Sequence, residues 1–158
     1  MPLTAFIAFL VTALFAGAAI YVSIAEHPAR LALDDVAALA QWKPSYRRGK
    51  LMQASLALIG SLLAFWVWWK GGTALWLAGG LLLLASWPVT LVLIMPVNRR
   101  LEAGDGTGPD TRALLVRWGR LHWIRTALGT SAALAMLWAL ACPARPTFDP
   151  GSLQISSR

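Results

Sequence analysis

The chain has 158 residues, of which 58% are hydrophobic, 13% are charged and nine are tryptophan. A soluble domain of this size needs more charge to cover its surface, so the composition indicates a membrane protein and excludes a separate soluble module. The single cysteine, Cys142, excludes an intramolecular disulfide and a cysteine-based metal cage.

Four apolar runs are each about 20 residues long, the length at which an α-helix crosses about 30 Å of hydrocarbon. They cover residues 3–25, 51–69, 73–95 and 123–142, and none of them contains an acidic residue. Runs of this length are too long for barrel strands, and a bilayer accepts only helices or closed barrels. The sequence therefore predicts an all-α fold, in which residues 1–142 form one four-transmembrane-helix bundle with the lipid bilayer as its partner.

The first run is expected to be a retained helix and not a cleaved signal peptide, because the segment before it, MPLTA, has no positive charge. After this run, apolar residues recur at helical spacing from Leu31 to Trp42, which predicts a short amphipathic interfacial helix in the first loop. Pro44 is expected to end that helix, and Ser45 is expected to cap the next one.

Further along the chain, the sequence FWVWWKGG at residues 65–72 predicts an aromatic belt at the outer interface, followed by a tight turn. The sequence EAGDGTGPD at residues 102–110 predicts a flexible crossing, after which one helix is expected to run from Thr111 through the fourth span. The tail at residues 143–158 contains three prolines and is expected to be disordered.

The distribution of positive charge predicts the orientation in the membrane. Ten of the 14 Lys and Arg residues lie in segments 26–50 and 97–122, which are the first and third loops of a four-span protein. These loops share one face, and the positive-inside rule places that face in the cytoplasm. We therefore expect a multi-pass protein of the bacterial inner membrane with both termini outside. The net charge of +7 follows from this topology and gives no reason to expect a nucleic-acid partner.

Polar and titratable side chains gather at the inner ends of all four predicted helices. They are His27 after the first span, Tyr46 and Gln53 at the start of the second, Asn98 after the third, and His122 and Arg125 at the start of the fourth. Trp118, His122 and Arg125 are spaced by four and three residues, so they share one helix face. Taken singly, each group also fits a structural role at the interface. Their convergence on one layer predicts a polar pocket near the inner leaflet.

Several short motifs occur in an order that resembles a known family. EHPA lies at residues 26–29, W-x3-Y-x2-G-x2-MQ at 42–53, P-x-N-x2-L at 96–101 and W-x3-H-x2-R at 118–125. The set resembles the anthrone oxygenase-like family of small integral membrane proteins over nearly the whole chain apart from the tail. The resemblance implies an oxidoreductase that oxidises a hydrophobic aromatic or phenolic small molecule with O2.

The chemistry of such a reaction suits the residues of the predicted pocket. An anthrone has an acidic methylene group between aromatic rings, and a neutral histidine is the usual base for such a proton. His122 is expected to be the base, because the nearby cation Arg125 favours the neutral imidazole, and His27 is expected to orient the substrate. Arg125, Tyr46 or Asn98 would stabilise the developing oxyanion.

Three aromatic or amide side chains complete the predicted site, and no cofactor is expected in it. Trp42, Gln53 and Trp118 are expected to contact the substrate. The electron-rich enolate can react with O2 directly, and the sequence contains no glycine fingerprint for a flavin or nicotinamide.

Two alternative interpretations remain open at the level of the sequence. His27 and His122 could be the axial ligands of a haem, which would make the chain an electron-transfer or haem-dependent oxidase protein. A small transporter or a structural membrane protein is the second alternative, although transporters usually need an intramembrane acid and these spans contain none. A homo-oligomer is compatible with the sequence.

Overall fold

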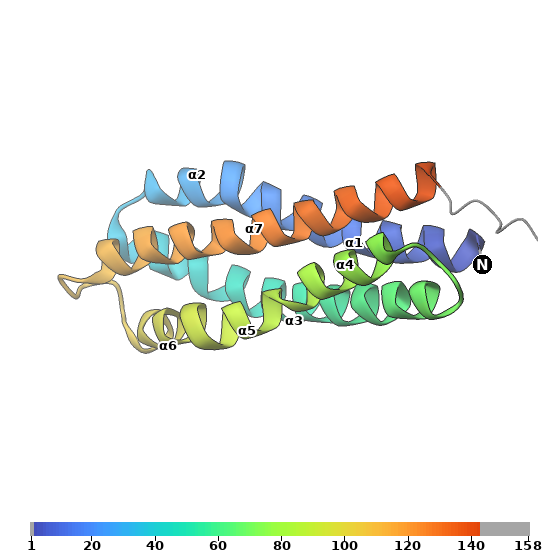
Figure 1. Ribbon diagram of the computed structural model, residues 1–158. Helices are drawn as coiled ribbons and strands as arrows, with labels where there is room; N and C mark the ends of the chain where they lie inside the picture. Colours follow the sequence, from blue (N-terminus) through green and yellow to red (C-terminus); the bar gives the residue numbers. More distant parts are fainter. Residues whose placement is uncertain (1, 143–158) are drawn as a thin grey trace, which may run out of the picture.

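The computed structural model describes residues 2–142 (Figure 1). Its helices are α1 (Pro2–Tyr21), α2 (His27–Leu31), α3 (Asp35–Trp69), α4 (Ala74–Leu84), α5 (Ser86–Val89), α6 (Met95–Ala103) and α7 (Thr111–Ala141), with π-helical segments η1 (Val22–Glu26) and η2 (Thr90–Ile94). Consecutive elements join into four helices that are long and apolar enough to cross a membrane: Leu3–Leu31, Asp35–Trp69, Ala74–Ala103 and Thr111–Ala141. The predicted all-α, four-helix fold is confirmed, and the chain is an integral membrane protein.

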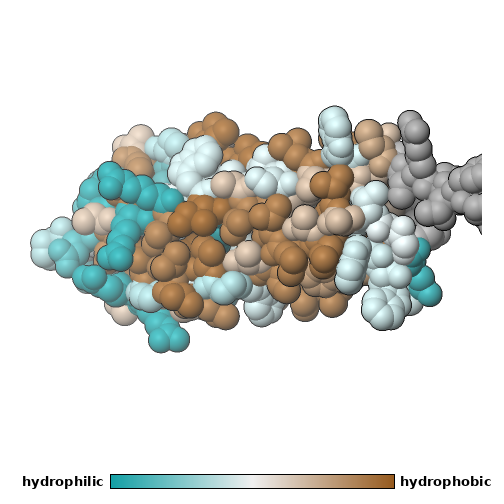
Figure 2. Space-filling view, in the orientation of Figure 1, coloured by the Kyte–Doolittle hydropathy of each residue, from teal (hydrophilic) through white to brown (hydrophobic). Residues whose placement is uncertain are grey.

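The four long helices pack as the corners of a square. α1 and α4 each pack along both α3 and α7, so α1 and α4 occupy opposite corners. The loops at 32–34 and 104–110 lie at one end of the bundle, which we call the basic end, and the turn at 70–73 lies at the other, which we call the tryptophan end (Figure 1). A broad hydrophobic band covers the middle of the visible face, and hydrophilic residues gather at the basic end (Figure 2).

α3 is longer than predicted, because it continues through Pro44. The carboxylate of Asp34 caps the helix by accepting a hydrogen bond from the N–H of Ala37, at 2.9 Å. A proline cannot donate to the carbonyl of Ala40, but its fixed φ angle suits a helix and a membrane helix tolerates one lost hydrogen bond. The predicted break at Pro44 and the predicted cap at Ser45 are therefore wrong.

The amphipathic segment of the first loop is the start of α3 and not a separate helix. Ala38, Leu39 and Trp42 are buried, and they form a cluster with residues of η2, α6 and α7. Within the apolar face that was expected to lie on the membrane surface, Leu39 and Trp42 instead pack on protein, whereas Leu33 and Val36 are exposed. This extension of α3 carries side chains beyond the apolar span and forms one wall of the cavity described below.

A proline follows each of the two π-helical segments. Pro28 comes two residues after η1, and Pro96 comes two residues after η2. A proline ring clashes with the carbonyl four residues before it in an α-helix. Those carbonyls belong to Ile24 and Val92, within the π-helical segments, where the wider turn makes room for the ring. π-helical turns are frequent at functional sites, and both segments border the cavity.

The other predicted boundaries can be compared directly with the structure. The crossing between α6 and α7 is non-helical, and α7 runs unbroken from Thr111 to Ala141, as predicted. The sequence 65–72 contains the end of α3 and the turn into α4, where Trp66, Trp68 and Trp69 are exposed. The tail at residues 143–158, which was expected to be disordered, lies outside the described residues.

Candidate active site

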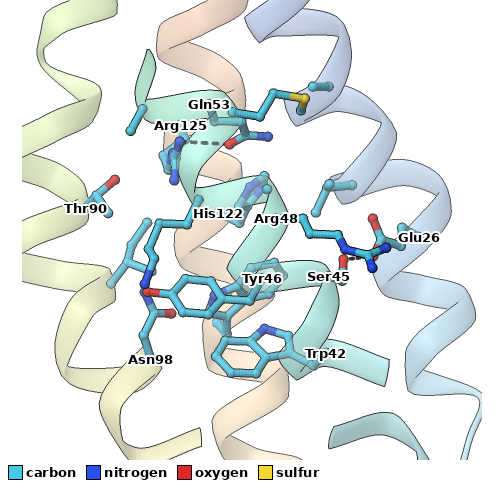
Figure 3. Close-up of a pocket in the computed structure, with 18 of the residues that line it drawn as sticks. Glu26, Trp42, Ser45, Tyr46, Arg48, Gln53, Thr90, Asn98, His122 and Arg125 are labelled. Carbon is cyan, nitrogen blue, oxygen red and sulfur yellow. Dashed lines mark hydrogen bonds between the residues drawn. The ribbon is translucent and has the colours of Figure 1, made fainter. Parts of the chain in front are cut away.

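A cavity of about 700 Å³ lies near the basic end and is lined by residues of all four membrane-spanning helices. This volume is in the range typical of small-molecule sites. Seven of the eight residues predicted to form the site line it: Trp42, Tyr46, Gln53, Asn98, Trp118, His122 and Arg125. In Figure 3, Arg125 and Gln53 lie on one side of His122, and Tyr46 and Asn98 lie on the other. The roles predicted for these residues remain predictions.

A chain of hydrogen bonds fixes the orientation of the imidazole ring of His122, which projects from α7. Its Nδ1 lies 3.1 Å from the hydroxyl oxygen of Ser23 in η1, and this oxygen lies 2.8 Å from the hydroxyl oxygen of Thr126. The Thr126 hydroxyl also lies 3.2 Å from the carbonyl oxygen of Ala19 and 3.3 Å from that of His122. Those carbonyls can only accept, so they favour an arrangement in which Thr126 donates to the main chain.

This arrangement determines which nitrogen of His122 carries the proton. Once Thr126 donates to the main chain, the Ser23 hydroxyl must donate to Thr126, because their oxygens are in hydrogen-bond contact. Ser23 then has only an acceptor to offer, and the Nδ1–H group of His122 donates to it. In the neutral imidazole the lone pair is therefore on Nε2, the nitrogen that is left for the cavity.

An aromatic wall runs along one side of the cavity. The rings of Tyr46 and Trp42 are stacked, with centroids 4.7 Å apart and an interplanar angle of 6°. Trp42 meets Trp118 edge to face at 5.9 Å, and Trp118 stacks on His122 at 5.0 Å. Trp42 is fully buried and Trp118 is buried. The half-buried ring of Tyr46, backed by Trp42, offers flat apolar surface to a planar aromatic ligand.

A phenol and an amide form a polar pair on the cavity side of α3 and α6. The Nδ2 group of Asn98 donates a hydrogen bond to the hydroxyl oxygen of Tyr46, at 3.1 Å. Because the phenol oxygen accepts this hydrogen bond, the phenol proton is free to be donated to a ligand. Asn98 is only 1% exposed, and within residues 2–142 its Oδ1 atom has no hydrogen-bond partner.

Arg125 lies a turn beyond His122 on the same face of α7. One Nη atom donates a hydrogen bond to Oε1 of Gln53 at 2.8 Å, and the guanidinium carbon lies 5.6 Å from the centre of the Phe15 ring. Within residues 2–142, Arg125 forms no ion pair with a carboxylate. Its Nε atom is buried and has no hydrogen-bond partner there. The expectation that this charge faces a cavity agrees with its position.

His27 lies outside the lining of the cavity, so the prediction that it bounds the pocket is wrong. Its ring packs against Trp118 with centroids 5.1 Å apart, and its Nδ1 lies 3.3 Å from an Nη atom of Arg30. The opposite edge of the ring faces the backbone of α7 at Gly119, where an added Cβ would overlap it. The missing side chain of Gly119 thus makes the room into which His27 turns, away from the cavity.

This position of His27 also bears on the haem alternative. A haem with two histidine ligands needs one nitrogen of each ring directed at a common space. One nitrogen of His27 is in contact with Arg30 and the other faces the backbone of α7, whereas His122 lines the cavity. The two histidines therefore do not fit a haem held between them. Among residues 2–142, no three His, Cys, Asp or Glu side chains come together as a candidate metal cluster.

A buried ion-pair network beside the cavity was not predicted from the sequence. Arg30 is 2% exposed, and one of its Nη atoms lies 2.5 Å from Oε1 of Glu26. The same Glu26 oxygen accepts from Ser45 and from Gln41, and Gln41 in turn accepts from Nε of Arg30. The spacing of four residues between Glu26 and Arg30 was the available signal, since such pairs meet on a helix.

Two further residues that the sequence did not reveal are Ser23 and Thr126, which hold His122. Both lie in apolar runs, where a single Ser or Thr usually donates to the backbone of its own helix and therefore gives no sign of a functional role. Their role depends on the helix packing that brings η1 next to α7.

Comparison with known proteins identifies the family of the chain. No curated protein and no solved structure matches the chain. The family model that describes anthrone oxygenases matches residues 42–135, which are 94 of the 158 residues. The match contains the seven predicted residues that line the cavity and does not extend to η1 and α2. Because it covers more than half of the chain, the protein belongs to the anthrone oxygenase family.

Proposed function

We propose that the protein is a membrane-embedded oxygenase that oxidises a planar, hydrophobic aromatic or phenolic substrate with O2 in the cavity around His122. The observation that carries the proposal is the meeting, in one cavity, of an imidazole with a free Nε2, a phenol with a free proton and an aromatic wall. The family match supports an anthrone as the type of substrate, with its acidic methylene carbon.

The first step is removal of a proton from the methylene carbon. Nε2 of His122 takes the proton, and the electron pair of the broken C–H bond spreads through the rings onto the carbonyl oxygen of the substrate. The hydroxyl of Tyr46 donates a hydrogen bond to that oxygen, and Asn98 holds the hydroxyl in place. The aromatic wall keeps water away from the anion and holds its rings flat.

The second step joins the carbanion to O2. One electron passes from the carbanion to O2, and the two radicals combine to form a C–O bond. The peroxide takes the proton held by His122, which is then neutral again. His122 removes the second proton from the same carbon, the O–O bond breaks, and a C=O bond forms. The departing hydroxide takes the proton from His122 and leaves as water, so that one CH2 group and one O2 give one C=O group and one water.

The orientation in the membrane is part of the proposal. The basic end carries ten Lys and Arg residues in segments 26–50 and 97–122, which supports a cytoplasmic location in the bacterial inner membrane and both termini outside. A Cys142→Ser, Asp105→Cys variant tests this, because Asp105 lies in the exposed crossing between α6 and α7. An impermeant maleimide is expected to label this cysteine only after the cytoplasmic side is opened. Labelling of intact cells from outside would show that the orientation is the opposite of the proposed one.

The activity itself is tested with purified protein in nanodiscs. An oxygen electrode and the absorbance of the product follow O2 uptake and quinone formation from an anthrone, with the uncatalysed autoxidation subtracted. We expect O2 and anthrone to be consumed one to one, at a rate proportional to the protein concentration. Uptake no faster than that of heat-denatured protein would remove the proposed oxygenase function.

A further inference from the structure

Arg125 lies within the membrane-spanning helix α7, and its charge is not neutralised by an ion pair in the described part of the chain. Along α7, Arg125 is about 20 Å from Trp138 at the tryptophan end, at a rise of about 1.5 Å per residue. A cation at this depth is costly unless it has a partner or faces a polar cavity. The three ion pairs found within residues 2–142 involve other residues.

The groups that hold Arg125 orient it without compensating its charge. Gln53 is 4% exposed and accepts a hydrogen bond from the guanidinium, while the ring of Phe15 faces it from α1. Both are neutral. Nε of Arg125 is buried without a partner, and the amide NH2 of Gln53 has no hydrogen bond within residues 2–142. Both side chains therefore have unused N–H donors, and such donors beside a positive charge can bind an anion.

The charged side chains that line the cavity also favour an anionic ligand. The cationic side chains that line the cavity are Arg30, Arg48, Lys50 and Arg125, and the acidic side chain is Glu26. Glu26 is already engaged, since one of its oxygens accepts from Arg30 and two neutral side chains. Arg48 and Lys50 are exposed at the outer part of the lining, where they would attract an anion.

We propose that Arg125 and Gln53 bind a carboxylate of the ligand, so that the cavity selects planar aromatic acids over neutral aromatic compounds. The rings would lie against Tyr46, which Trp42 supports from behind, and the carboxylate would accept hydrogen bonds from the guanidinium and from the amide of Gln53. This rests on the proposed function, in which His122 and Tyr46 act on the substrate, and adds the class of substrate.

Binding of two matched probes tests the proposal without any turnover. Anthracene-9-carboxylate and 9-anthracenemethanol share the ring system and differ in charge. Both accept excitation energy from tryptophan, so titration of protein in zwitterionic nanodiscs gives a dissociation constant for each. We expect the carboxylate to bind the wild-type protein about tenfold to a hundredfold more tightly than the alcohol, as for a hydrogen-bonded charge pair. Equal affinities for the two probes would overturn the proposal.

Three variants assign the preference to this pair. Gln53→Glu places an internal carboxylate beside Arg125, so it is expected to abolish the preference while the protein stays folded. Arg125→Gln is expected to do the same. Arg120→Gln is the control, because Arg120 is exposed on the same helix and lies outside the lining. A preference that survives in Gln53→Glu would place the anion elsewhere and refute the proposed site.

Two further measurements distinguish the aromatic-acid site from a lipid-binding site and from the oxygenase activity. Myristate offers a carboxylate on a flexible chain, as a membrane fatty acid does, and is expected to displace anthracene-9-carboxylate only weakly. Displacement by myristate at the concentration at which a second planar aromatic acid displaces the probe would show that the site takes lipid carboxylates, against the proposed aromatic class. O2 uptake, measured with a neutral anthrone and with an anthrone that carries a carboxylate, tests the proposed oxygenase function separately. Uptake without a preference between the probes would refute the anion site alone, and a preference without uptake of O2 with either anthrone would refute the oxygenase alone.

Discussion

The two ends of the bundle use polar side chains in opposite ways. Near the tryptophan end, the hydroxyl of the buried Ser61 donates to the carbonyl of Ala57 one turn back in its own helix, at 2.7 Å. Near the basic end, Asn98 on α6 donates a hydrogen bond to Tyr46 on α3. Arg125 on α7 likewise donates to Gln53 on α3. A group that bonds its own helix needs no ligand, whereas these cross-helix pairs leave donors and acceptors free. One half of the bundle is built for packing and the other for binding.

The half of the bundle near the tryptophan end is tightly packed, whereas the half near the basic end encloses the cavity. At Gly60, near the tryptophan end, an added Cβ would lie 2.7 Å from Leu83 and 3.0 Å from Thr12, so three helices meet there with no spare volume. In the other half, α3 and the segment from α5 to α6 separate around a cavity of about 700 Å³. If function and stability divide along the same line, substitutions in the two halves should affect different measurements.

The largest effect is expected for His122→Ala. Loss of a general base typically lowers the rate about 10²–10⁴-fold, so O2 uptake with an anthrone should fall by that factor in protein that remains folded. His27→Ala is the matched control, because His27 lies outside the cavity and should keep the wild-type rate. Size-exclusion chromatography establishes folding for both variants. Wild-type turnover in His122→Ala would remove it as the base.

The next largest effect is expected for Tyr46→Phe. This change removes the proton that stabilises the oxyanion, and loss of one such donor lowers the rate about 10²–10³-fold. The chain has only two tyrosines, and Tyr21→Phe is the control: Tyr21 also borders the cavity, but it is 60% exposed and has no part in the proposed chemistry. The turnover number with saturating anthrone is the measurement. Equal losses in both variants would mean that the effect is not specific to the oxyanion.

A third prediction concerns the packed half of the bundle and changes stability instead of rate. Gly60→Ala is expected to lower the free energy of unfolding by about 1–3 kcal/mol, as overpacking of a full interior does. Gly17→Ala should not lower it, because an added Cβ there has no neighbouring atom within 4 Å and alanine is the better helix former. Unfolding in mixed detergent micelles gives both values. A strong loss of turnover per folded molecule in Gly60→Ala would contradict the division between the two halves.

The sequence predicts the four helices well, because a bilayer imposes a length and an apolar composition that can be counted. It fails at Pro44, where burial of Trp42 on the preceding turn holds the helix together through the proline. A proline is a local signal, and the packing that overrides it involves residues of η2, α6 and α7 that lie more than 45 positions further along the chain. No local pattern contains that information.

The part of the candidate site that lies on one helix could be predicted from the sequence, because helical spacing determines which side chains share a face. Trp118, His122 and Arg125 follow one another on a helix face, and all three line the cavity. His27 was misplaced, because the π-helical turn before it changes the direction in which the following side chains point. The direction of His27 also depends on Gly119, which leaves the room for its ring only after α2 and α7 have packed.

The smallest effect is expected from the hydroxyl that holds His122. Ser23→Ala removes the hydrogen bond to Nδ1, and a neutral hydrogen bond contributes about 0.5–1.5 kcal/mol, so turnover should fall by roughly tenfold or less. Ser55→Ala is the control, because the exposed Ser55 donates to the carbonyl of Leu51 in its own helix and should keep the wild-type rate.

The tautomer of His122 can be observed directly, because the chain has only two histidines. In a His27→Asn background, ¹⁵N-histidine labelling leaves one imidazole, whose protonated and unprotonated nitrogens have well-separated chemical shifts in solid-state NMR. At alkaline pH we expect a protonated Nδ1 and an unprotonated Nε2, since Nδ1–H donates to Ser23. Ser23→Ala should add a second population with the proton on Nε2, because nothing then favours Nδ1–H. A protonated Nε2 in the presence of Ser23 would mean that Ser23 donates to the ring, and Nε2 could not then be the base.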